Sequence, residues 1–247
     1  MIASRLGLCS VTFRKMSPEK IIDIAKKAGI SFIEWGADVH VKTTEDAKKV
    51  KDLCDKNSIS ISSYGSYFNS AFFDEEKWVQ VCEITKEMGA DSIRIWLGKK
   101  NSEDTDEEYY NLLLSNTKVM CEIAARYGLF VCPECHDNTF NNNTDAILRF
   151  ISDLRRDNFR TYFQSRYRRS AYDLDRIERT FPYIKNVHIS FRDLKREQLF
   201  RKKDKSYIKT LLKKLEEKSF SGIVMIEFVS SDSEKSLLKD IEKLKKY

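Results

Sequence analysis

The most constraining feature of this chain is the regular alternation of short strand-like runs with longer amphipathic segments. The expected strands lie near residues 6–13, 31–35, 59–64, 92–97, 129–136, 161–164, 186–190 and 223–229. Strict alternation predicts parallel strands joined by helical crossovers. Eight such units in 247 residues match the usual size of a closed (β/α)₈ barrel. The sequence therefore predicts one TIM-barrel domain over residues 1–247.

Glycines support this division of the chain. Four of them are expected to end a helix just before a strand, namely Gly29, Gly89, Gly128 and Gly222. Ser17 and Pro18 have the types expected of an N-cap and a first helical residue, so a helix should begin there. A doubly wound open sheet is the alternative fold. No glycine-rich dinucleotide fingerprint follows the first strand, so the barrel is favoured.

Composition excludes several classes of protein. With 41% hydrophobic residues the chain can build a core, which argues against intrinsic disorder. No apolar run approaches the ~18 residues of a membrane span. The first residues lack a basic region followed by a long apolar stretch, so no export signal is predicted. A cytoplasmic protein with six reduced cysteines is the expectation.

The net charge of +6 comes from one part of the chain. Residues 155–220 hold 20 Lys and Arg against 9 Asp and Glu. A basic region can indicate nucleic-acid binding, but a solvated helix face explains residues 195–218 better. We expect neither a nucleic acid nor a membrane as partner, and leave a homo-oligomer open.

Chemistry in such a barrel belongs at the C-terminal ends of the strands. Glu134 lies near the end of the fifth expected strand, and His188 and Glu227 lie within apolar strand sequence. Burying a carboxylate is costly without a partner, and a divalent cation would supply one. Mn²⁺, Mg²⁺ or Co²⁺ suits these ligands, with Zn²⁺ as an alternative, and Gln164 could add a neutral oxygen. A hydrogen-bonded structural histidine and a glutamate paired with an arginine are the competing interpretations.

Several segments together resemble a known family. They are residues 8–14 (LCSVTFR), 33–36 (IEWG), 38–40 (DVH), 134–136 (E-x-H), 181–188 (FPYIKNVH) and 226–228 (IEF). The chain is similar over its whole length to the xylose isomerase-like TIM-barrel superfamily of sugar isomerases and epimerases. This resemblance implies a sugar-type substrate and one divalent metal held by Glu134, Gln164, His188 and Glu227. Gln164 stands where the family usually has Asp, which makes the site one charge less negative.

The residues permit a definite mechanism. A ketose would chelate the metal through its carbonyl and a neighbouring hydroxyl, and the metal would acidify the adjacent carbon. Glu134 and Glu227 are the expected catalytic acid and base, acting through an enediolate. The predicted activity is that of a sugar or sugar-phosphate isomerase or epimerase. A keto-sugar or inosose-type dehydratase begins with the same proton abstraction, and a degenerate, non-catalytic sugar-binding barrel is suggested by Gln164.

Substrate contacts are predicted from positions near strand ends. They are His40, His136, Trp35, Tyr64, Trp96 and Arg166. Arg166, Arg168 and Arg169 follow the sixth strand, and Arg192 follows the seventh, so an anionic sugar phosphate or sugar acid is expected. The loop 230–233 has three serines at the start of the last helix, and its hydroxyl and backbone N–H groups would help to bind that anion. Each group also has an alternative interpretation. The histidines would be solvated loop residues, the aromatic residues would fill the core, and the arginines would pair with acidic loop residues.

Two other functions compete. Cys132 and Cys135 form a C-x-x-C pattern typical of redox or zinc chemistry, but a zinc knuckle would need a second pair and a redox motif would open a helix. Endonuclease IV shares the barrel but needs a histidine-rich cluster of three zinc ions. Three histidines in the whole chain cannot supply that cluster, so DNA repair is set aside.

Overall fold

The computed structural model describes residues 2–164, 170–190 and 202–244. Its strands are β1 (Leu6–Cys9), β2 (Phe32–Gly36), β3 (Ser60–Asn69), β4 (Ser92–Trp96), β5 (Phe130–Pro133), β6 (Thr161–Gln164), β7 (Ile184–Ile189) and β8 (Ile223–Ile226). Its helices are α1 (Pro18–Ala28), α2 (Thr44–Lys56), α3 (Glu75–Met88), α4 (Glu107–Arg126), α5 (Thr144–Leu154), α6 (Ser170–Thr180), α7 (Lys202–Glu217) and α8 (Glu234–Leu244). Strand and helix alternate as the sequence predicts.

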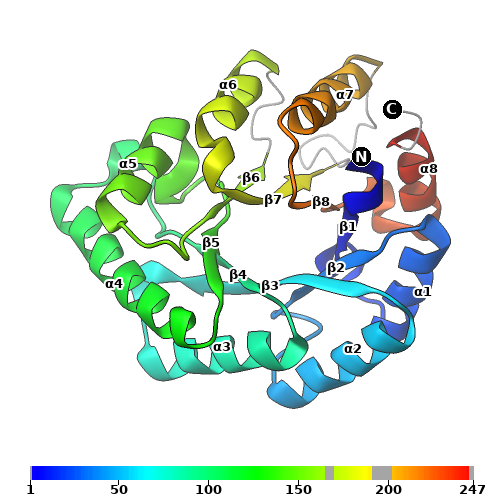
Figure 1. Ribbon diagram of the computed structural model, residues 1–247, viewed down its shortest axis with the longest axis horizontal. Helices are drawn as coiled ribbons and strands as arrows, with labels where there is room; N and C mark the ends of the chain where they lie inside the picture. The colour runs from blue at the N-terminus through cyan, green and yellow to red at the C-terminus, as the bar shows by residue number, and fades with distance from the viewer. Residues whose placement is uncertain (1, 165–169, 191–201, 245–247) are drawn as a thin grey trace.

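The strands form one parallel sheet that curves into a barrel inside a ring of helices (Figure 1). Their order is β5-β4-β3-β2-β1-β8-β7-β6, so the first strand pairs with the last. Two isolated bridges, Val131 with Phe159 and Glu134 with Tyr162, bring β5 against β6. The predicted (β/α)₈ barrel is confirmed.

Helix ends show why the local sequence folds in this way. The Ser17 hydroxyl accepts a hydrogen bond from the Lys20 amide at 3.4 Å and so caps α1. Gly29, with a φ of 64°, ends the same helix in the left-handed conformation, as predicted.

The prediction that Gly222 ends a helix is wrong. Helix α7 stops at Glu217, and Ser219, with a φ of 57°, takes the left-handed conformation. A Cβ atom at Gly222 would lie 2.1 Å from the carbonyl oxygen of Lys185. Glycine is required there because the backbone passes close to β7.

Strand β3 contains an irregularity that matters for the site. Its pairing with β4 shifts register between Gly65 and Phe68, and Tyr67 adopts a φ of 57°. This bulge places the Tyr67 ring 4.8 Å from the guanidinium carbon of Arg94. The expected third strand ended at residue 64, before this bulge.

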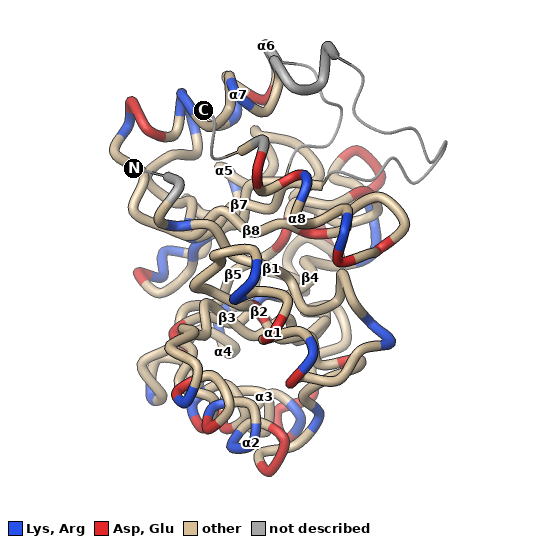
Figure 2. The backbone as a smooth tube through the Cα atoms, turned by 90° about the vertical axis from the view of Figure 1, so that its right-hand side faces the viewer, with Lys and Arg blue, Asp and Glu red and all other residues tan. Residues whose placement is uncertain are grey.

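Charges on the outer helices are largely of mixed sign. Lys and Arg lie among Asp and Glu on α2 and α3 (Figure 2). In the basic part of the chain, Lys214 of α7 and Lys218 just after it pair with Glu178 of α6 at 2.6 and 2.7 Å. These contacts agree with a solvated helix surface. Among the helices described, none combines the length and apolar character needed to cross a bilayer.

Candidate active site

Ionisable side chains converge at the C-terminal ends of the strands. We call five of them the carboxylate–histidine cluster: Glu34 of β2, Arg94 of β4, Glu134 just after β5, His188 of β7 and Glu227 just after β8. All five are buried, and His188 has no exposed surface at all. Ion pairs and hydrogen bonds among them offset the cost of burying so many charges.

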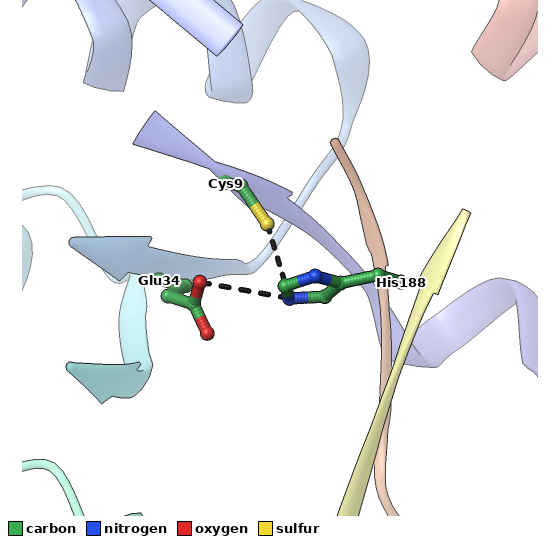
Figure 3. Close-up of side chains that lie close together, drawn as sticks. All are labelled: Cys9, Glu34 and His188. Atoms are coloured by element: carbon green, nitrogen blue, oxygen red, sulfur yellow. Dashed lines mark hydrogen bonds and ion pairs between the residues drawn. The ribbon is translucent and has the colours of Figure 1, made fainter. Parts of the chain in front are cut away.

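His188 lies at the centre of the cluster and uses both ring nitrogens. Its Nδ1 lies 3.1 Å from an oxygen of Glu134 and 3.7 Å from an oxygen of Glu227. Its Nε2 lies 3.5 Å from Glu34 Oε1 and 3.5 Å from Cys9 Sγ, as Figure 3 shows. The Nδ1 edge of the imidazole therefore points to residues that follow β5 and β8, and the Nε2 edge points to residues of β1 and β2.

Arg94 joins two of the carboxylates. Its Nε donates to Glu34 Oε1 at 3.0 Å, and its Nη1 donates to Glu134 Oε2. Ser63 on β3 donates to the other oxygen of Glu34 at 2.8 Å. Glu34 and Glu134 are thus held in fixed orientations by neighbours on separate strands.

The pKa values of the three carboxyls differ because their neighbours differ. Burial alone would raise the pKa of Glu134, but the charges of Arg94 and His188 outweigh it and lower that pKa to about 2. The same two cations hold the pKa of Glu34 well below its usual range, against the effect of burial. Glu227 has no such cation in contact apart from His188, so burial and the nearby Glu134 charge raise its pKa to about 7.

His188 carries a proton in this arrangement. Burial would lower its pKa, but Cys9 and the carboxylates of Glu34 and Glu227 outweigh burial and raise the pKa well above its usual value. The metal-free cluster therefore balances two cations, Arg94 and His188, against the ionised Glu34 and Glu134. Glu227, with a pKa of about 7, adds between zero and one negative charge near neutral pH.

Gln164, at the end of β6, borders the cluster beside Glu227. Its Nε2 donates to Glu227 Oε2 at 2.9 Å. Its carbonyl oxygen Oε1 is buried and has no hydrogen-bond partner among the described residues. A buried acceptor without a donor is costly, and a cation would satisfy it.

These donors fit a divalent cation. Ligand atoms of Glu134, His188 and Glu227 lie within 4.8 Å of one another, and Gln164 Oε1 adds a fourth, neutral oxygen. Two carboxylates, an imidazole and an amide oxygen are ligands that Mn²⁺, Mg²⁺ or Co²⁺ accepts. Binding such an ion requires His188 to release the proton on Nδ1.

The other predicted site residues divide into two groups. Trp96 and His136 lie together at the rim, with ring centroids 4.5 Å apart, and Trp96 also stacks on Tyr67 at 6.4 Å. Trp35 and Tyr64 are buried in the core instead, because each directly follows an inward-facing residue, Glu34 or Ser63, and neighbours in a strand face opposite sides. The structure does not bring these two aromatics to the carboxylates.

His40 and Arg166 also stand apart from the cluster. The ring nitrogens of His40 lie 3.0 Å from Ser10 Oγ and 3.2 Å from the carbonyl oxygen of Met16, so both are already in use. Arg166 falls outside the residues that the structure describes, as do Arg168, Arg169 and Arg192. Ser233 in the predicted anion loop caps α8 by accepting from the Ser236 amide at 3.2 Å.

Residues of the site that were not predicted include Cys9, Glu34, Arg94 and Tyr67. Glu34 and Arg94 each interrupt an apolar strand, FIEWG and SIRIW. A charged residue within an apolar strand is the pattern on which the prediction of His188 and Glu227 rests, so the same pattern could have predicted Glu34 and Arg94. Cys9 carries no such signal, since a small apolar thiol is ordinary in a buried strand.

The C-x-x-C pattern has no redox features in the structure. Cys132 and Cys135 are both buried, and no disulfide joins any of the six cysteines. Burial raises the pKa of the Cys132 thiol far above its usual value, which makes it a poor nucleophile. The cysteines of this pattern are core residues.

Fold and cluster together define a (β/α)₈ barrel with its ionisable residues gathered at the C-terminal ends of the strands. The model of the xylose isomerase-like TIM barrel family matches residues 22–247. The chain belongs to that family.

Similar proteins include a dehydratase and several epimerases. A 3-dehydroshikimate dehydratase of Bacillus anthracis is 22% identical over 197 residues, covering 74% of this chain and 70% of the relative. The crystal structure of a probable dehydratase of the same type from that organism has a TM-score of 0.83 at 15% identity, covering 98% of both chains. A 3-keto-D-glucoside 4-epimerase of E. coli has a TM-score of 0.76 at 14% identity, covering 98% of this chain and 99% of the other. A D-psicose 3-epimerase of Clostridium cellulolyticum has a TM-score of 0.71 at 13% identity, covering 97% and 96%. At these identities the structural matches show the fold.

Proposed function

We propose that this protein is a divalent-metal-dependent enzyme that removes a proton next to the carbonyl of a sugar-like hydroxyketone. One observation carries the proposal. Glu134, His188 and Glu227 offer three ligand atoms within 4.8 Å of one another, beside an amide oxygen of Gln164 that has no partner. Epimerases and a dehydratase among the similar proteins support the substrate class.

The residues that hold the metal are Glu134, Gln164, His188 and Glu227. When bound, a divalent ion acts as a Lewis acid that stabilises negative charge on a carbonyl oxygen. Arg94 keeps Glu134 ionised and oriented as a ligand. Tyr67, Trp96 and His136 form an aromatic wall beside the cluster, which limits the entry of water and favours a substrate with an apolar ring face.

Proton transfer falls to Glu227. In the metal-free cluster burial and the Glu134 charge raise the pKa of Glu227 to about 7, so it is the more basic of the two glutamates, whereas Glu134, with a pKa of about 2, stays ionised. Glu227 Oε2 accepts a hydrogen bond from Gln164 and lies 3.7 Å from His188 Nδ1. The cluster thus contains one strong proton acceptor and one fixed carboxylate.

Two outcomes follow from the same abstraction. Return of the proton to the opposite face or to the adjacent carbon gives an epimerase or isomerase. Loss of a hydroxyl from the next carbon gives a dehydratase, which is the second candidate because the dehydratase of Bacillus anthracis shares sequence with this chain. A single proton acceptor suffices for dehydration, whereas epimerisation needs a donor on each face.

The experiment measures bound metal first and then proton exchange. We expect one Mn²⁺ per chain by metal analysis, and deuterium uptake from D₂O into a panel of ketoses and cyclic hydroxyketones. Uptake without loss of water identifies an isomerase or epimerase, and a new enone absorbance identifies a dehydratase. A chain that binds no ion even with added Mn²⁺ would instead be a degenerate sugar-binding barrel.

Glu227→Gln should abolish this exchange by a factor of about 10³ or more, because it removes the proton acceptor but keeps the shape of the side chain. Circular dichroism should show an intact fold. Glu83→Gln, on an exposed face of α3, is the matched control and should retain full activity. Retained exchange in Glu227→Gln contradicts the assignment.

We further propose that the substrate is an anion, a sugar phosphate or sugar acid. The arginines that motivate this lie outside the described residues, and the loop 230–233 lies next to β8. Thermal-shift screening should show stabilisation by such anions in the presence of Mn²⁺. Stabilisation by neutral sugars alone contradicts it.

A further inference from the structure

We propose that Glu34 is a positioning residue that keeps the proton of His188 on Nε2 and thereby presents Nδ1 to the metal. This inference rests on the proposed function, since it concerns how the metal site is prepared. It assigns a role to a buried carboxylate that is not itself among the proposed ligands. Its support comes from the contacts of Glu34 with His188, Ser63 and Arg94, and from the contact of Arg94 with Glu134.

The first contacts are those of the His188 ring. Glu34 Oε1 lies 3.5 Å from Nε2, on the opposite side of the imidazole from Glu134 and Glu227. Figure 3 shows Glu34 and Cys9 approaching this same nitrogen. A neutral imidazole has one donor nitrogen and one acceptor nitrogen, so a carboxylate at Nε2 keeps the proton there and leaves the Nδ1 lone pair for a metal.

The second contacts fix Glu34 itself. Ser63 donates to Glu34 Oε2 at 2.8 Å, and Arg94 Nε donates to Oε1 at 3.0 Å. Arg94 also binds Glu134, so the carboxylate at Nε2 and the proposed ligand at Nδ1 are tied to the same guanidinium. Glu34, Arg94 and Glu134 therefore form one rigid unit that orients two metal ligands.

A second metal ion is the competing explanation, since Cys9, Glu34 and His188 also offer ligand atoms within 4.8 Å of one another. Two observations argue against it. Both oxygens of Glu34 already accept hydrogen bonds, Oε1 from Arg94 at 3.0 Å and Oε2 from Ser63 at 2.8 Å, so neither is left for an ion. Cys9 Sγ lies 3.5 Å from His188 Nε2, in hydrogen-bond contact with the nitrogen that such an ion would need. Cys9 is better explained as packing that keeps water away from Nε2.

The first test is the ¹⁵N spectrum of His188 in the zinc-loaded protein, labelled with ¹⁵N-histidine. Zn²⁺ is the probe because it is diamagnetic. The chain has three histidines, and His40→Gln and His136→Gln assign the other two signals. We expect a directly bonded proton on Nε2 and a metal-shifted Nδ1. The reverse pattern, with zinc on Nε2, overturns the inference even if zinc binds tightly.

The second test uses substitutions and measures Zn²⁺ affinity by titration calorimetry. Glu34→Leu removes the acceptor at Nε2 and should weaken binding 10- to 100-fold, as loss of such a supporting carboxylate commonly does. Glu34→Gln keeps an acceptor oxygen and should recover part of that loss. Glu83→Leu is the control and should bind zinc like the unmodified protein.

The outcomes separate the two proposals. If the unmodified protein binds neither Zn²⁺ nor Mn²⁺, the proposed function fails and this inference fails with it. If it binds zinc but Glu34→Leu binds equally well, the inference alone is overturned. If Glu34→Leu does not fold, the spectrum of the unmodified protein decides the question.

Discussion

At the scale of single residues, Gln164 distinguishes this site. Its amide supplies a hydrogen bond to Glu227 and leaves a carbonyl oxygen without a partner. The family resemblance implies an anionic ligand at this position, whereas this chain has a neutral amide. In the proposed metal site the consequence is one negative charge less, with the amide also bonded to Glu227.

Gln164→Asp should therefore bind Mn²⁺ about tenfold more tightly, because it adds a negative ligand to the ion. The same change should destabilise the metal-free protein, since the new carboxylate faces Glu227 without an amide donor between them. Calorimetric titration measures the first effect, and urea unfolding in the presence of a chelator measures the second. Unchanged affinity would mean that position 164 does not contact the ion.

Metal binding should also depend on pH in a definite direction. At pH 7 His188 is protonated and Glu227, with a pKa of about 7, is about half protonated in the metal-free cluster. An ion must displace about one proton from His188 and a fraction of one from Glu227. Affinity for Mn²⁺ should therefore rise from pH 5.5 to pH 8. Calorimetry in buffers of different ionisation enthalpy counts the protons, and a count of zero at pH 7 would contradict the assigned ligands.

At the scale of elements, the bulge in β3 shapes the cluster. Gly65 at its start lies so close to Arg94 that a Cβ atom there would be 2.7 Å from Nη2 and 3.3 Å from Glu34 Oε1. The strand can pass the buried ion pair only because residue 65 lacks a side chain. The bulge then turns Tyr67 over the guanidinium.

Gly65→Ala should accordingly cost about 1–3 kcal/mol of folding stability and weaken Mn²⁺ binding, because the added methyl displaces Arg94 from its two glutamates. Gly128→Ala is the matched control. A Cβ atom there would have no neighbour within 4 Å, but the φ of 72° penalises alanine by about 1 kcal/mol. Urea unfolding and calorimetry should show lost stability in both variants and lost affinity only in Gly65→Ala.

The elements also show how far the sequence alone could lead. Apolar periodicity and helix caps are local, so the eight strands and a junction such as Gly29 could be predicted. Gly222 could not, because its need for glycine comes from β7, far away in the sequence. His188 and Glu227 were found because a charge in an apolar strand needs a partner. Their connection through Arg94 and Glu34 depends on which strands meet across the barrel, and no local pattern contains that information.

At the scale of the whole molecule, the barrel has a seam between β5 and β6. Only two isolated bridges join these strands among the described residues, whereas every other neighbouring pair is hydrogen-bonded as strands of the sheet. The proposed ligands Glu134 and Gln164 lie on opposite sides of this seam. A bound ion would therefore close it.

Metal should slow hydrogen exchange at the seam more than elsewhere. The amides to follow are those of Val131 and Arg160, which donate to Asn158 and Val131 across the seam. Amides of β1, paired on both sides, should change less. Ion at 100 times its dissociation constant should also stabilise the fold by about 2.7 kcal/mol. Equal slowing throughout the barrel would argue against a ligand set that spans β5 and β6.

The paired charges of Arg94 and His188 have a consequence for how the protein acquires its metal. Small zinc domains stay unfolded until an ion neutralises their ligands. Here the two cations already neutralise Glu34 and Glu134, so we expect the barrel to fold without an ion. Metal binding would then be the exchange of a proton for a cation in the folded protein. The supply of Mn²⁺, Co²⁺ or Zn²⁺ around the folded chain, and not the act of folding, would decide which ion it carries.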